Sequence, residues 1–111
     1  MKLERRYHPR IPVSWSVTLH NVQGHFDGRT KDISVDGVSV LLLEKPAFGE
    51  NFPILLKPSL VRPIEAVVKR VWLDTFDLEG KSAFGMGAQF IYISPEAKHF
   101  IATLVEKQRK D

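Results

Sequence analysis

The sequence predicts a mainly β protein, a six-stranded antiparallel β-barrel with a C-terminal α-helix. Six short segments carry the β-branched, aromatic or alternating residues that are typical of strands. Turn residues separate these segments, and no helical segment lies between them to form the crossovers of a parallel sheet. An amphipathic helical stripe follows the last segment. Antiparallel closure into a small barrel satisfies all three observations.

Recognisable turns divide the strand-like segments. Residues 13–19 alternate apolar and polar side chains and predict a first strand with one buried face. Residues 21–24 and the dipeptide Asp36-Gly37 predict two hairpin turns. Residues 74–82 are charged, which indicates an exposed connection. The six expected strands are residues 13–19, 26–33, 38–43, 52–56, 64–73 and 83–93.

The C-terminal helix has clear start signals. Ser94 is a suitable N-cap, Pro95 fits the first helical position, and Glu96 lies at the positive end of the helix dipole. The helix is expected over residues 95–109. Its apolar stripe, expected to pack on an open end of the barrel, comprises Ala97, Phe100, Ile101, Leu104 and Val105.

The chain is expected to form one domain with a short arm ahead of it. Its 111 residues suffice for a single modest core. Residues 1–12 are polar, basic and interrupted by Pro9 and Pro12, which favours a flexible N-terminal arm over a helix. Residues 13–111 are expected to form the barrel and its helix.

Composition excludes several classes of protein. The 16 Lys and Arg residues nearly balance the 13 Asp and Glu residues, which argues against general coating of nucleic acid. The absence of cysteine excludes disulfides and zinc–thiolate sites, and the cytoplasm is the predicted location. The longest apolar run, residues 40–43, is too short to cross a bilayer, so no membrane insertion is expected.

Two short patterns carry the chemistry of a candidate binding site. Arg6 and Arg10 lie four residues apart, and a guanidinium can donate two hydrogen bonds to the O6 and N7 atoms of a guanine or bind phosphate oxygens. Asp32 and Ser34 supply acceptors for the N1–H and amino donors of guanine. Gly37 is expected to let the backbone turn where a Cβ would obstruct it. Together these residues suit a site that reads guanine and holds a dianion.

These five residues resemble the ligand motifs of the PilZ domain family, RxxxR and D/N-x-S-x-x-G, in the family's order. The resemblance implies a six-stranded barrel followed by a helix, and a receptor for cyclic di-GMP. An arginine directly before the first motif, here Arg5, resembles the members that hold the ligand as an intercalated dimer. Trp72 is included among the expected ligand contacts because some members use an aromatic residue on this strand, with packing in the core as the alternative.

No catalytic constellation is present, so a binding protein without turnover and without a cofactor is expected. Binding is expected to order the arm around cyclic di-GMP and to change the interaction with a downstream protein that the sequence does not identify. One alternative is a PilZ-fold scaffold in pilus or motility assembly that acts without nucleotide. A barrel for single-stranded nucleic acid is not expected, since only Lys69, Arg70 and Trp72 approach the required mixture of basic and aromatic residues.

Two metal sites were considered and neither is expected. Residues 32–37 imitate the start of an EF-hand, but the twelfth position is Leu43 and strand-like sequence flanks the loop. His20 and His25 can face each other across the first hairpin, near Asp27, but no cysteine or further carboxylate group accompanies them.

Overall fold

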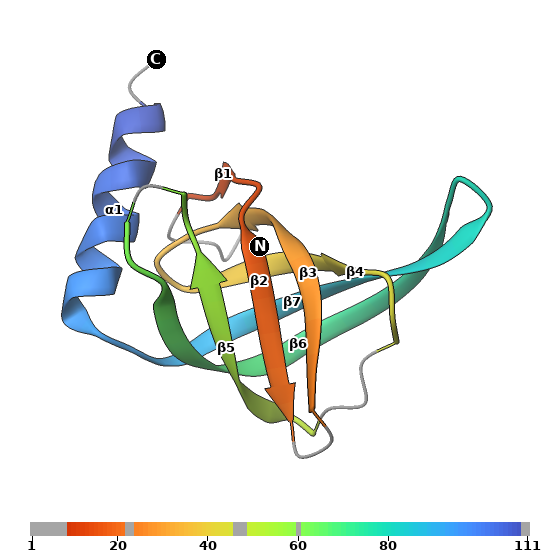
Figure 1. Ribbon diagram of the computed structural model, residues 1–111. Helices are drawn as coiled ribbons and strands as arrows, with labels where there is room; N and C mark the ends of the chain where they lie inside the picture. Colours follow the sequence, from red (N-terminus) through yellow and green to blue (C-terminus); the bar gives the residue numbers. More distant parts are fainter. Residues whose placement is uncertain (1–8, 22–23, 46–48, 60, 110–111) are drawn as a thin grey trace, which may run out of the picture.

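The computed structural model describes residues 9–21, 24–45, 49–59 and 61–109 of the chain. Within these residues a closed barrel is flanked on one side by a helix, and a long two-stranded ribbon projects from the other side (Figure 1). The strands pair only in antiparallel fashion. The arrangement follows from a sequence that offers hairpin turns but no helical crossovers.

The described residues form seven strands and one helix. The barrel order is β3-β2-β5-β6-β7-β4, and pairing between β3 and β4 closes it, while the short β1 adds to the end of β3. The predicted fold class, a six-stranded antiparallel barrel with a C-terminal helix, is therefore confirmed. The elements are β1 (Ile11–Pro12), β2 (Ser16–Asn21), β3 (Gly24–Ile33), β4 (Gly37–Leu42), β5 (Asn51–Lys57), β6 (Ile64–Leu78), β7 (Lys81–Ile93) and α1 (Pro95–Arg109).

Alternating side chains of the barrel strands fill a single core. On β5, Phe52, Ile54 and Leu56 are buried while the residues between them are more exposed, as a strand with one buried face requires. The inward-facing residues of the other strands bring long aliphatic side chains together in the barrel interior, and β4 is buried along most of its length. Fully buried side chains include Val17, Leu19, Ile33, Val38, Val40, Leu42, Leu56, Val68, Met86 and Ile101.

Helix α1 begins at the predicted cap and packs on the barrel. The Ser94 hydroxyl accepts a hydrogen bond from the Ala97 amide at 3.1 Å, which satisfies one of the amides that a helix start leaves unpaired. Ile101 is fully buried in the same apolar cluster as the strands, and Phe100 stacks on Trp15 with ring centroids 6.3 Å apart. Among the described residues, no helix has the length and apolarity needed to cross a membrane.

The prediction for residues 74–82 is correct in the exposure of these residues but wrong in treating them as a connection between strands. β6 and β7 stay paired as far as Leu78 and Lys81, and this paired segment is the ribbon that projects from the barrel (Figure 1). The turn between them uses Glu79 at φ 53° and Gly80 at φ 83°, which are left-handed conformations typical of a tight hairpin turn. The strand pattern was missed because most of the ribbon is exposed, so its residues do not alternate between apolar and polar.

The last two residues of the predicted arm belong to the sheet. Ile11 lies opposite Ile33 and Pro12 lies opposite Asp32, and the Ile11 side chain is buried in the core. The chain is thus fixed beside the end of β3 from Ile11 onward, whereas the sequence predicts a flexible arm as far as residue 12. Residues 1–8, which make up most of the predicted arm, lie outside the described residues.

Candidate functional site

The turn between β3 and β4 is held by its own hydrogen bonds. The Ser34 hydroxyl accepts a hydrogen bond from the Asp36 amide at 3.0 Å, and the Ser34 amide donates to the Gly37 carbonyl at 2.9 Å. The Ser34 side chain is only 1% exposed. Ser34, predicted as a direct acceptor for the ligand, therefore shapes the turn in this structure.

Gly37 is required by a close approach of two strands. A Cβ at this position would overlap the carbonyl oxygen of Ala88 on β7. The glycines with positive φ among the described residues are Gly24 and Gly80, so Gly37 does not adopt a left-handed conformation, and the obstruction that the sequence predicted for a Cβ here comes from β7. The Phe90 amide donates to the Asp36 carbonyl at 2.8 Å, which ties the turn to β7 as well. The motif turn is thus fixed on two sides.

Arg10 and Asp32 form an ion pair on the outside of the barrel. Nη1 of Arg10 donates to Oδ1 of Asp32 at 2.8 Å. The two side chains remain 23% and 34% exposed, so both can also meet a ligand. Pairing of Pro12 with Asp32 sets this geometry, because it holds the chain after Arg10 against β3. The pair offers guanidinium donors and a carboxylate acceptor side by side.

A row of four residues runs from this ion pair across the outer face of the barrel. Asp32 on β3 lies opposite Ser39 on β4, Ser39 lies opposite Gly87 on β7, and Gly87 lies opposite Trp72 on β6. Residues opposite each other in antiparallel strands project from the same face. Four adjacent strands span about 14 Å at the usual spacing. We call this set the outer-face row. Ser39 is small, and Gly87 leaves room for the indole ring of Trp72.

Trp72 lies on the outer surface, across the glycines of β7. A Cβ at Gly87 would overlap the indole ring, and a Cβ at Gly85 would be in van der Waals contact with it. The Trp72 side chain is 43% exposed, so part of the ring faces solvent. Phe76, four residues farther along the same face of β6, also contacts the position of Gly85 and is partly exposed. The alternative of packing in the barrel core is excluded for Trp72.

The structure thus brings Arg10, Asp32 and Trp72 to one face and puts Ser34 and Gly37 beneath it, in the turn. Arg5 and Arg6 lie outside the described residues. Sequence reasoning missed Ser39 and Gly87, although the turn at Asp36-Gly37 predicts that a residue near 39 pairs with Asp32.

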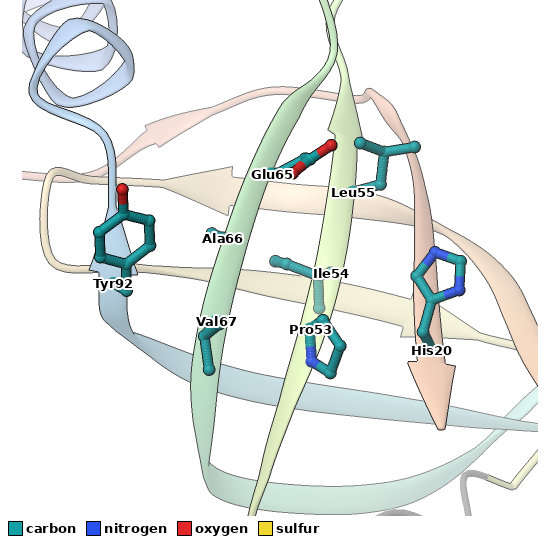
Figure 2. A pocket seen from close by; sticks show the side chains of 8 residues that line it. All are labelled: His20, Pro53, Ile54, Leu55, Glu65, Ala66, Val67 and Tyr92. Carbon is teal, nitrogen blue, oxygen red and sulfur yellow. The ribbon is translucent and has the colours of Figure 1, made fainter. Parts of the chain in front are cut away.

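A second hollow lies on another part of the barrel surface. It has a volume of about 360 Å³ and crosses β5 and β6 between His20 and Tyr92 (Figure 2). Its other lining residues are mostly apolar, with Glu65 as the charged exception. None of the predicted site residues lines it. No group of three or more metal-ligating side chains occurs among the described residues.

Comparison with known proteins identifies the family. The model of the PilZ domain matches residues 4–107 of this chain. No curated protein matches the sequence.

Solved structures share the fold at low sequence identity. The PilZ domain of YcgR from Escherichia coli, solved with c-di-GMP, has a TM-score of 0.78 and 16% identity, covering 96% of this chain and 93% of that one. The inhibitor of motility MotI/DgrA of Bacillus subtilis has a TM-score of 0.77 and 13% identity, covering 96% of this chain and 52% of that one. The MrkH–c-di-GMP complex of K. pneumonia has a TM-score of 0.77 and 17% identity, covering 98% and 57%. The chain therefore spans little more than half of the latter two proteins.

Proposed function

The chain belongs to the PilZ domain family, and on that premise we propose that it is a receptor that binds cyclic di-GMP without converting it. The observation that carries the proposal is the exposed pair of Arg10 and Asp32, held at 2.8 Å beside the motif turn. The similar PilZ domain of YcgR was solved with c-di-GMP. Because that protein is only 16% identical, the structural similarity supports the fold alone. The case for the ligand rests on the chemistry of Arg10 and Asp32.

The chemistry of the exposed pair suits guanine. The fork of Arg10 donates to the O6 and N7 edge of one base, and the carboxylate of Asp32 accepts from the N1–H and amino groups. Arg5 and Arg6, which precede the pair in sequence, supply further donors for the two phosphates. In this proposal Ser34 and Gly37 act by fixing the turn that presents Asp32.

Trp72 supplies an aromatic surface at the far end of the outer-face row. A partly exposed indole can stack on a purine, and Asp32 and the indole ring lie on opposite sides of Ser39, so a ligand with two bases can contact both. Arg5 indicates that two intercalated cyclic di-GMP molecules bind together, and we expect this pair to lie along the outer-face row. Ser39 is the small residue between the ion pair and the indole ring, which itself covers Gly87, so the space for the ligand lies above Ser39.

Ligand binding has to reorganise the ion pair. Because both side chains are partly exposed, the bond between Arg10 and Asp32 contributes only about 0–1 kcal/mol to stability, so the ligand replaces it at small cost. Fixing the residues from Arg6 to Pro9 costs more, about 1–2 kcal/mol each. We propose that contacts of the arginines with the ligand offset this cost, and that the ordered arm alters the surface offered to a downstream protein. The cytoplasmic location stays a prediction.

Titration calorimetry with cyclic di-GMP tests the proposal. Arg10→Ala and Asp32→Ala are each expected to weaken binding by at least about tenfold, since a bidentate arginine–guanine contact contributes about 1–3 kcal/mol. Arg62→Ala removes an exposed arginine from the loop before β6 and serves as the matched control, with unchanged affinity expected. Absence of binding by the unaltered, folded chain would favour the scaffold alternative, and unchanged affinity in both site variants would reject the assigned site.

A further inference from the structure

The end of the β2–β3 hairpin holds two histidines directly opposite each other. His20 of β2 and His25 of β3 are cross-strand partners, with ring centroids 6.2 Å apart and ring planes inclined by 52°. Opposite residues in an antiparallel pair project from the same face, and both of these side chains are exposed. Figure 2 shows the imidazole of His20 standing out from β2 beside the hollow on β5 and β6.

The separation of the two rings fits joint ligation of one metal ion. A zinc–nitrogen bond of about 2.0–2.1 Å puts the centroid of each ligating ring roughly 3 Å from the ion, and hence two centroids roughly 5–6.5 Å apart. The observed 6.2 Å lies at the upper end of that interval, so the two exposed rings have to move slightly closer to reach a tetrahedral angle. Within the described part of the chain, no hydrogen bond or ion pair engages either imidazole, so ligation displaces no existing partner there.

The neighbouring charge also favours a cation. Asp27 follows His25 on the same face of β3, and its Oδ1 accepts a hydrogen bond from the Thr18 hydroxyl at 3.0 Å. The pair of Thr18 and Asp27 is the next one on the same face of the hairpin. A fixed carboxylate therefore lies near the two rings and attracts positive charge there. Asp27 is not a third ligand, because no group of three ligating side chains is present among the described residues. Water has to complete the coordination.

We propose that His20 and His25 form a two-histidine binding site for a late first-row divalent cation such as Zn²⁺, Ni²⁺ or Cu²⁺. Imidazole suits these ions, whereas Mg²⁺ and Ca²⁺ prefer oxygen ligands. The sequence predicted that the two rings can face each other but no metal site, because no cysteine or further carboxylate group accompanies them. The site is independent of the cyclic di-GMP site, since His25 and Asp32 are separated by about 23 Å along β3. A bound ion joins the two strands directly beside the turn of their hairpin.

Calorimetric titration of the untagged chain with ZnCl₂ tests this site. One ion is expected per chain, and His20→Asn and His25→Asn are each expected to weaken binding by at least about tenfold, because loss of either ring removes the chelate. His99→Asn alters an exposed histidine on α1 and is the matched control, expected to bind zinc as the unaltered chain does. Zinc binding that is unchanged in the variant carrying both hairpin substitutions would refute the proposal, as would the absence of binding at millimolar zinc.

A second measurement locates the ion directly. Cu²⁺ is paramagnetic, so addition of a fraction of an equivalent is expected to broaden the amide signals of the hairpin around residues 20 and 25 first. Early broadening centred on His99 instead would contradict the assignment. Both variants alter exposed side chains and should retain the circular dichroism of the parent. Unchanged affinity for cyclic di-GMP in both variants shows that the barrel is intact, whatever the outcome of the zinc titration.

Discussion

Gly87 determines where the side chain of Trp72 lies on the barrel surface. The indole ring of Trp72 occupies the space that a Cβ at Gly87 would fill, so the tryptophan lies flat on β7 while part of the ring stays exposed. A glycine in a strand interior usually weakens the strand, and the overlying aromatic ring compensates for this loss. The position of the ring, and hence any stacking on a base, depends on residue 87.

Gly87→Ala is therefore expected to move the Trp72 ring and to weaken binding of cyclic di-GMP. Stacking of a base on an aromatic side chain contributes about 1–3 kcal/mol, which sets the scale of the expected loss. Tryptophan fluorescence and a ligand titration measure the two effects. Gly49→Ala is the control, since a Cβ there meets nothing within 4 Å. A displaced ring with unchanged affinity would remove Trp72 from the site.

The sequence identified the residue types of the motif, but not all of their roles. Arg10 and Asp32 form an ion pair, and the chemistry of both exposed charges is evident from their identity. Ser34 bonds to the Asp36 amide within the turn itself, whereas Gly37 is required by the backbone of β7, and that contact depends on the tertiary pairing. Local sequence contains turn preferences but no information about which strand lies next to the turn.

At the scale of elements, buried segments were predictable and exposed ones were not. The helix was recognised because Ser94, Pro95 and Glu96 give a start signal and the apolar stripe gives the buried face. The outer half of the β6–β7 ribbon was read as a loop, because a strand without a buried face has no alternation to recognise. The two-residue turn at Glu79 and Gly80 is the one local signal that indicated a hairpin there.

The cap of α1 supplies a prediction at this scale. Ser94→Ala removes the hydroxyl that accepts from the Ala97 amide and is expected to lower the free energy of unfolding by about 0.5–2 kcal/mol. Urea denaturation followed by circular dichroism measures the change. Thr103→Ala, at an exposed position within α1, is expected to leave stability nearly unchanged. Equal stability of the parent and the Ser94 variant would show that the capping bond is replaced by water without loss.

At the scale of the whole molecule, barrel and helix form one cooperative unit. Ile101 of α1 is fully buried in the same cluster as the inward residues of the barrel strands, so helix and sheet share their core. Closure of the barrel through β3 and β4 leaves no unpaired edge between these strands. This sharing predicts that the helix does not unfold separately.

Ile101→Ala is expected to destabilise the whole fold by about 2–5 kcal/mol, the usual cost of a large core truncation. The loss should appear at the same urea concentration in the helical circular dichroism and in the fluorescence of Trp15, which stacks on Phe100 of the helix. Glu106→Ala, exposed on the same helix, provides the control. Two separate transitions would show that α1 is an independent unit.

The short strand β1 has a mechanical consequence for any longer protein that contains this domain. It anchors the polypeptide at Ile11, next to Asp32. The ten residues ahead of that anchor reach at most about 33–36 Å when stretched. A neighbour attached at residue 1 would be tethered within that radius. If the ligand orders these residues as proposed, the tether becomes shorter, and binding would then change the distance between the two domains without any rearrangement of the barrel.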